Sequence, residues 1–339
     1  MSLLRGIAPM FVGAAILAAP DSDFDVVIRG VLTRYLRFTT SELADLQAGK
    51  IVRHGLDSTA AGEVGVVGAI KINAPKTKFL TQVHDIARFK SGPDVLQIGK
   101  FSRPPTIDDL ASLTVEPGDF DARGCKVGDC GVRLPAAVIQ RFERELDLKA
   151  PDLQQRAGAH FKQVLLDDVT AYVTGGPGRF EQYDDGSRPI RPLDEFEGVL
   201  RSSPALAALV PGLPDHLKNF PTGRLPEADD FLYWSKEKVS MAAFITVTHV
   251  TIVCPSPATC VMTTKDVYSS RYIDASLAIT IATDTVQTPA AFYLVYANRS
   301  RANALKGGFS ALRRALVERR ARGSLEANLR TLKLQLERE

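Results

Sequence analysis

The chain has 339 residues, of which 45% are hydrophobic and 24% are charged, a composition that is ordinary for a soluble globular protein. The formal net charge is +3, with acidic and basic residues well mixed. This balance excludes a dedicated nucleic-acid-binding protein, because such proteins cluster lysine and arginine in one basic domain. The length allows about two domains or one enlarged domain.

The first 19 residues have the pattern of an export signal. Arg5 gives a short basic start, and residues 6–19 form an apolar run rich in small side chains. An apolar run of about 14 residues is too short to span a bilayer and suits a signal peptide. We therefore predict a signal peptide at residues 1–19 and a protein that is periplasmic or secreted. The alternatives are an N-terminal core helix and a membrane anchor.

Residues 20–62 are predicted to form a helical segment and a linker. Apolar side chains recur at helical spacing between residues 24 and 38. Thr39 and Glu42 have the spacing of a capping box, which predicts a second helix that ends near Gly49. Residues 55–62 are small and polar, as expected of a linker.

The next segments alternate between strand and helix patterns. Residues 64–71 are rich in β-branched residues and glycine, which indicates a strand that Pro75 ends. Helical spacing follows over residues 76–89, and residues 94–101 indicate another strand.

Residues 118–226 are predicted to be a mostly helical insertion. Pro135 marks a helix start, and the clearest helical periodicity covers residues 151–173. A further helical stretch covers residues 196–209, and residues 130–134 are predicted to form a short strand.

The four cysteines are predicted to form two local disulfides, Cys125–Cys130 and Cys254–Cys260. An even number of cysteines in an exported protein suggests disulfides, and each of these pairs flanks turn residues. A four-thiolate zinc site and free thiols are the alternatives, although zinc ligands are usually spaced more tightly than the second pair.

The last third of the chain has strand patterns and then becomes helical. Residues 231–237, 244–253, 262–283 and 291–298 are predicted strands, with a bend near Ser269. One amphipathic helix is predicted from about residue 305 to Glu339, because its leucines recur at 4-3-4 spacing. Gly323 is expected to break or bend this helix.

The segment from Ala69 to Pro75, followed by a helix that contains Val83-His84-Asp85, resembles the opening of START-like (SRPBCC, helix-grip) domains. The strands and the long helix at the C-terminus follow the order in which those domains end. The resemblance covers residues 63–339, with residues 118–226 as an insertion. It implies an α+β fold in which a curved antiparallel sheet grips a long C-terminal helix around a hydrophobic cavity. It carries over no catalytic residues, because the superfamily shares a cavity and not one active site.

His249, Tyr272 and Asp274 are the candidate catalytic residues. Histidine titrates near neutral pH, so His249 with Tyr272 or Asp274 could act as acid and base. A lone histidine on an apolar strand face is, however, more often a core residue.

Aromatic residues of the C-terminal half are candidates for orienting an amphipathic ligand, because Tyr and Trp combine an apolar body with a polar tip. Ordinary strand packing would enrich aromatics as well. Together with two residues of the terminal helix, the predicted ligand-binding residues are Tyr233, Trp234, His249, Tyr272, Tyr293, Tyr296, Phe309 and Leu312.

The predicted function is to bind, and to carry, a hydrophobic small molecule or lipid in the sheet–helix cavity. The alternatives are a cyclase- or hydrolase-type enzyme that uses the same cavity and an envelope adaptor that uses the C-terminal helix. No cofactor, metal ion or nucleic acid is expected. The helix face from Arg313 to Arg322 would contact anionic lipid headgroups, unless it is a solvated face balanced by Glu318 and Glu326.

Overall fold

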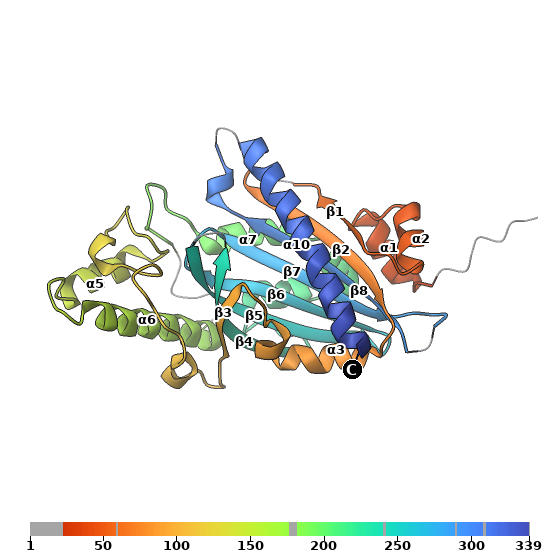
Figure 1. Cartoon of the computed structure of the whole chain (residues 1–339), viewed down its shortest axis with the longest axis horizontal. Helices are drawn as coiled ribbons and strands as arrows, with labels where there is room; N and C mark the ends of the chain where they lie inside the picture. Colours follow the sequence, from red (N-terminus) through yellow and green to blue (C-terminus); the bar gives the residue numbers. More distant parts are fainter. Residues whose placement is uncertain are drawn as a thin grey trace, which may run out of the picture.

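Eight antiparallel strands form one curved sheet in the order β1-β2-β8-β7-β6-β5-β4-β3 (Figure 1). The computed structural model describes residues 23–58, 60–175, 182–239, 242–288, 290–307 and 310–338. The strands are β1 (Val52–Leu56), β2 (Glu63–Ile72), β3 (Val95–Lys100), β4 (Asp229–Val239), β5 (Ala242–Ser256), β6 (Thr259–Ser269), β7 (Ala275–Asp284) and β8 (Phe292–Arg301). The α-helices are α1 (Val26–Arg34), α2 (Thr40–Gln47), α3 (Lys76–His84), α4 (Ile86–Phe89), α5 (Ala136–Glu145), α6 (Leu153–Gly175), α7 (Pro192–Arg201), α8 (Ala205–Leu209), α9 (Leu213–Asn219) and α10 (Ser310–Arg338).

The sheet is covered on both faces. Because side chains alternate along a strand, Val247 and Val250 of β5 pack in different cores. In Figure 1, α10 lies across the near face and α7 lies behind the sheet. We call the face with α10 and Val250 the front face, and the face with Val247 the back face. The α+β architecture with a long C-terminal helix on an antiparallel sheet is therefore as predicted.

Helix α10 packs closely on β2 at Gly68. A Cβ atom at Gly68 would lie 2.9 Å from the Leu325 side chain and 3.0 Å from that of Leu329, so a larger residue at this position would displace these leucines. Leu325, Leu329 and Leu336 are buried, and the helix runs without interruption from Ser310 to Arg338. The break predicted at Gly323 is wrong, since the helix continues through this residue, and the buried leucines that follow it hold the C-terminal half of α10 against the sheet.

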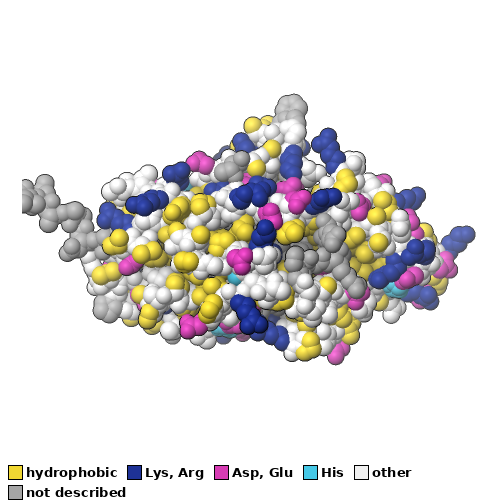
Figure 2. All heavy atoms as spheres, turned by 180° about the vertical axis from the view of Figure 1, so that it is seen from behind, with side chains coloured by type: hydrophobic (Ala, Val, Ile, Leu, Met, Phe, Trp, Pro, Cys, Tyr) yellow, Lys and Arg dark blue, Asp and Glu magenta, His cyan; other side chains and the backbone are white. Residues whose placement is uncertain are grey.

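Helices α1, α2, α7, α8 and α9 cover the back face. Their apolar side chains form one core with Leu277, Ile279 and Val295 of the sheet. Helix α2 begins with the predicted capping box, in which the Thr39 and Glu42 side chains accept from each other's backbone N–H groups. Figure 2 shows apolar and charged side chains interspersed over this side of the molecule.

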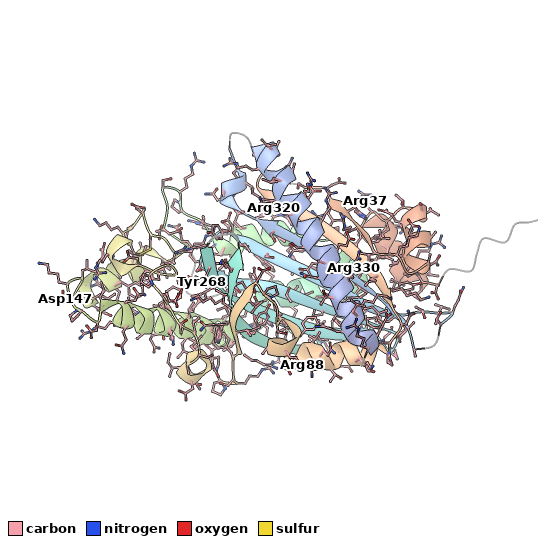
Figure 3. The ribbon with its side chains drawn as sticks, in the orientation of Figure 1. Arg37, Arg88, Asp147, Tyr268, Arg320 and Arg330 are labelled. Carbon is pink, nitrogen blue, oxygen red and sulfur yellow. A yellow bond between two sulfur atoms is a disulfide. The ribbon has the colours of Figure 1, made fainter. Side chains whose placement is uncertain are left out.

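A lobe that contains α5 and α6 projects from one end of the sheet (Figure 1). Tyr268 lies where the lobe meets the sheet (Figure 3) and donates a hydrogen bond of 3.1 Å to the carbonyl of Arg133. The predicted strand at residues 130–134 is not formed. The backbone N–H groups of Cys130 and Arg133 instead donate to single carbonyls of Asp185 and Ser270, which ties a loop to the sheet and lobe.

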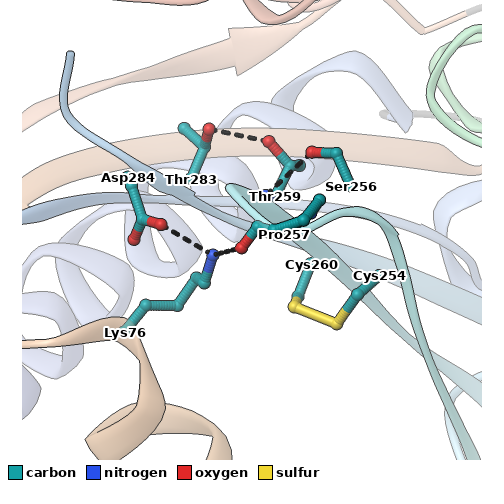
Figure 4. The surroundings of a disulfide bond; sticks show 8 residues. All are labelled: Lys76, Cys254, Ser256, Pro257, Thr259, Cys260, Thr283 and Asp284. Atoms are coloured by element: carbon teal, nitrogen blue, oxygen red, sulfur yellow. Dashed lines mark hydrogen bonds and ion pairs between the residues drawn. A yellow bond between two sulfur atoms is a disulfide. The ribbon is translucent and has the colours of Figure 1, made fainter.

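Both predicted disulfides are present, Cys125–Cys130 and Cys254–Cys260. The second closes the turn between β5 and β6 (Figure 4). Buried Lys76 also holds this turn, because its Nζ lies 2.7 Å from the Pro257 carbonyl and 3.0 Å from Asp284 Oδ2 at the end of β7. Two disulfides indicate an oxidising, non-cytoplasmic compartment. None of the described helices has the length and apolarity that a membrane crossing requires.

Further elements differ from the sequence prediction. Residues 262–283, predicted as one bent strand, form β6 and β7, which reverse direction and pair with each other. Strand β1 and helix α9 were not predicted. The residues predicted as a signal peptide lie outside the described residues.

Candidate functional site

A cavity of about 410 Å³ lies between the end of α6, the loop after β3 and the start of β4. Val173 and Thr174 line it from α6, Phe220 lines it from the residue after α9, and Asp230 and Leu232 line it from β4. Residues 101–105 of the loop complete the wall. The volume and the mostly apolar wall fall within the range of small-molecule sites, about 300–1,000 Å³.

Asp230 belongs both to the cavity wall and to a cluster of polar side chains on the back face. His216 Nε2 lies 3.0 Å, and His249 Nε2 lies 2.9 Å, from the same oxygen, Asp230 Oδ1. The hydroxyl of Thr251 donates to that oxygen at 2.7 Å. Both histidines are buried. Helix α9 and strands β4 and β5 thus bring two imidazoles to one carboxylate at the edge of a cavity.

The outer nitrogen of each imidazole also has a partner. His216 Nδ1 lies 2.7 Å from the carbonyl oxygen of Gly223. His249 Nδ1 lies 2.8 Å from the hydroxyl of Tyr172 on α6. The ring of Phe220 packs against that of His249, with 4.3 Å between their centroids. These contacts fix the orientation of both rings.

The surroundings shift the pKa values of the two histidines in opposite directions. Burial opposes a charge on either ring. For His249 burial prevails and lowers its pKa. For His216 burial is the largest single effect, but the hydrogen bond and the charge of Asp230 and the hydrogen bond to Gly223 together outweigh it and raise its pKa. Burial likewise opposes ionisation of Asp230, but the hydrogen bonds from His216 and His249 hold the pKa of its carboxyl below the usual range. The cluster therefore contains an ionised carboxylate near neutral pH.

Lys265 lies beside this cluster, opposite His249 in the pairing of β5 with β6. Its Nζ donates to the Leu217 carbonyl at 2.7 Å and lies over the rings of Phe196 and Tyr172, at 4.3 Å and 5.2 Å from their centroids. Burial lowers the pKa of Lys265 to about 7. A buried lysine with such a pKa can act as a base or a nucleophile.

Of the three predicted catalytic residues, only His249 belongs to the cluster. Tyr272 is 45% exposed, and its ring packs against Phe244. Asp274 is buried and forms an ion pair with Arg133. The structure therefore brings His249 together with Asp230 and Tyr172, and not with Tyr272 or Asp274.

The predicted ligand-binding side chains of the sheet lie on two different faces. Tyr233 and Tyr296 face the front, whereas Trp234, His249 and Tyr293 face the back. Trp234 is fully buried in the core beneath the lobe, and the Tyr293 hydroxyl donates to Asp23 at 2.6 Å. One ligand cannot contact both faces of a sheet, so these residues do not form a single site.

The two predicted ligand-binding residues of the terminal helix do not line the contact with the sheet either. Leu312 is 72% exposed, because it lies on a part of α10 whose leucines point to solvent; Leu316 is 50% exposed. Phe309 lies outside the described residues. The buried leucines of α10 are those that follow Gly323.

The front face has a polar group of its own. Half-buried Lys90 lies 2.7 Å from Glu237 Oε1 and donates to the Tyr233 hydroxyl at 3.2 Å. The Thr248 hydroxyl donates to Asp266 Oδ1 at 3.1 Å. Burial raises the pKa of Asp266 to about 7, so this carboxyl takes up its charge near neutral pH.

Replacing Asp266 with asparagine is expected to stabilise the protein more at pH 8 than at pH 5. The folded chain holds the Asp266 proton up to about pH 7, whereas the unfolded chain releases it near pH 4. The stability that Asp266 provides at low pH is therefore lost as the pH rises through 7. After a discount for partial exposure, the gain of Asp266→Asn over the wild type should grow by about 1–2 kcal/mol over this interval. Urea denaturation of the variant and the wild type at both pH values measures this difference in the free energy of unfolding. A difference that does not change with pH would contradict the prediction.

His216 and Asp230 were not predicted from the sequence. His216 lies in a helix of only seven residues, between proline-rich stretches that have the pattern of a loop. Asp230 has the spacing of Leu232 and Trp234 in β4, two residues apart, which puts all three on one face. This spacing is the signal in the sequence that the aspartate lies on a buried face.

Comparisons with protein-family models, with curated proteins and with solved structures give no match to this chain. The resemblance to START-like domains therefore remains a prediction from the sequence motifs, and the fold and the site stand on the chain's own residues.

Proposed function

We propose that this protein binds a small, largely apolar molecule in the cavity beside α6, in the periplasm or outside the cell. The observation that carries the proposal is the cavity itself, about 410 Å³ with an apolar wall and a buried polar cluster at one edge. Most small-molecule sites combine these two features. The ligand class is the one expected from the sequence, but the cavity lies on the back face of the sheet, away from α10.

The size and polarity of the cavity restrict the ligand. A volume of about 410 Å³ is near the lower end of the usual range, which favours a single small molecule or one short acyl chain over a complete lipid. Asp230 is ionised and presents an acceptor at the wall. The polar end of the ligand is therefore a hydrogen-bond donor, such as a hydroxyl or an ammonium group.

Val173→Trp is expected to weaken ligand binding at least about 10-fold, because the indole would occupy the cavity at the end of α6. Binding of the neutral fluorophore N-phenyl-1-naphthylamine, followed by its fluorescence increase, provides the measurement. Thr170→Trp is the matched control, since Thr170 lies one turn earlier on α6 and is exposed. Equal affinity of the two variants would contradict the proposal.

A hydrolase-type enzyme is the second candidate. The observation that favours it is the cluster of His249, Asp230, Tyr172 and Lys265, of which Asp230 lines the cavity. His249 has a hydrogen-bonded carboxylate and hydroxyl, as a general base requires. Hydrolysis of short p-nitrophenyl esters would test this function. A loss of turnover in His249→Gln would support it, and turnover that is unchanged in His249→Gln would remove His249 from any such reaction.

A further inference from the structure

Three potential metal ligands of the back face converge at the wall of the cavity. His216 Nε2, a carboxylate oxygen of Asp230 and His249 Nε2 all lie within 4.8 Å of one another. We propose that these three side chains bind a divalent transition-metal ion of the zinc type. Two imidazoles and one carboxylate are a common protein ligand set for such ions. The proposal rests on the geometry of these side chains and does not depend on which molecule the cavity binds.

The hydrogen bond of His216 fixes which of its nitrogens is available. The Gly223 carbonyl can only accept, so His216 Nδ1, at 2.7 Å from it, carries a proton. Nε2 is then the nitrogen that faces Asp230, and in the neutral ring it carries the lone pair. An imidazole whose outer N–H donates to a backbone carbonyl while its inner nitrogen faces the site is the usual arrangement of a metal-binding histidine.

Similar outer contacts orient the other two ligands. The Tyr172 hydroxyl, 2.8 Å from His249 Nδ1, can accept a hydrogen bond from that nitrogen, and this leaves His249 Nε2 free to coordinate. The Thr251 hydroxyl donates to Asp230 Oδ1 at 2.7 Å and holds the carboxylate in place. Each of the three ligands thus has a second partner, as metal ligands commonly have.

The spacing of the three ligand atoms is close to the spacing around a bound ion. Metal–ligand distances of about 2.0–2.2 Å in a tetrahedral site place ligand atoms about 3.3 Å apart. The two imidazole nitrogens lie 2.9 Å and 3.0 Å from Asp230 Oδ1, a few tenths of an ångström below this value, and they lie within 4.8 Å of each other. Asp230 also lines the cavity, which leaves room for a fourth ligand, water or a bound molecule.

The neighbouring groups are compatible with a bound cation. Lys265 does not point into the cluster, because its Nζ bonds to the Leu217 carbonyl and lies over two aromatic rings. Both cysteine pairs are oxidised, so thiolates do not compete for the metal.

Isothermal titration calorimetry tests the site, with zinc titrated into the full chain after treatment with a chelator. We expect one zinc ion per chain, and affinity lowered at least about 100-fold in Asp230→Asn and in His249→Gln, since each removes one of three ligands. His84→Gln is the matched control, because exposed His84 lies 3.5 Å from the adjacent carboxylate, Asp229, and this variant should bind zinc like the wild type.

Cobalt provides a second readout that does not require ligand substitution. The wild-type chain with cobalt should show the visible absorption of low-symmetry nitrogen and oxygen coordination. Tyr172→Phe keeps all three ligands but loses the hydroxyl that orients His249, and it should weaken cobalt binding about 10-fold. Absence of stoichiometric zinc binding to the wild type would overturn the proposal. Binding that survives Asp230→Asn in a folded protein, or that is lost in His84→Gln, would overturn it as well.

Discussion

Replacing Glu63 with alanine is expected to lower the free energy of unfolding by about 3–5 kcal/mol. The Glu63 carboxylate is fully buried and accepts from Arg299 at 3.0 Å and from two nitrogens of Arg301 at 3.1 Å each. The hydroxyl of Ser202, just after α7, also donates to it at 3.1 Å. Through these hydrogen bonds Glu63 connects β2 with β8 and with the helices that cover the back face. Its removal leaves two largely buried guanidinium groups without their shared carboxylate.

Urea denaturation followed by circular dichroism measures this loss, with an unchanged dependence on urea concentration as evidence that the unfolded state is the same. Glu195→Ala is the matched control, because Glu195 also pairs with Arg301, at 3.4 Å, but its side chain is 21% exposed. The control should lose at most about 1 kcal/mol. Similar losses for both variants would show that burial does not determine how much Glu63 contributes to the free energy of unfolding.

Replacing Trp234 with alanine should cost about 3–5 kcal/mol through the cavity that it leaves. This side chain is fully buried between the sheet and the lobe, and its Nε1 donates to the Asp109 carbonyl at 2.8 Å. Trp234→Phe keeps most of the packing and loses the hydrogen bond, so its cost should be about 1–2 kcal/mol. Equal costs for the two variants in urea denaturation would contradict a packing role.

Gly99 offers an independent check on the placement of Trp234. The two residues are paired across β3 and β4, and a Cβ atom at Gly99 would lie 2.6 Å from the indole nitrogen. Gly99→Ala should therefore destabilise the wild type and be nearly neutral in the Trp234→Ala background. Additive effects in this double-mutant cycle would show that the indole does not lie over Gly99.

The parts of the fold that were predicted correctly depend on local signals. The capping box at Thr39 and Glu42, the helical periodicity of residues 151–173 and the alternation along β5 each show in a short stretch of sequence. Local disulfide pairing was predicted for the same reason, because turn residues separate each pair of cysteines. Helix α9 escaped prediction because its seven residues are too short for periodicity to show.

The candidate site depends on contacts that no local pattern contains. His249 was singled out as a polar residue on an apolar strand face, and the structure places it on a buried face beside a cavity. Its partners Asp230 and His216 come from another strand and from α9, and the order of the strands decides which polar side chains meet. For the same reason the predicted aromatic residues could not be sorted between the front and back faces.

Native mass spectrometry of the protein purified from its own envelope or medium tests ligand binding in the α6 cavity most directly. The wild type and Thr170→Trp should each carry the mass of one small molecule, and Val173→Trp should be free of it. If Val173→Trp retains the same bound mass, or if the wild type carries none and does not bind the fluorophore, the cavity beside α6 is not a ligand site.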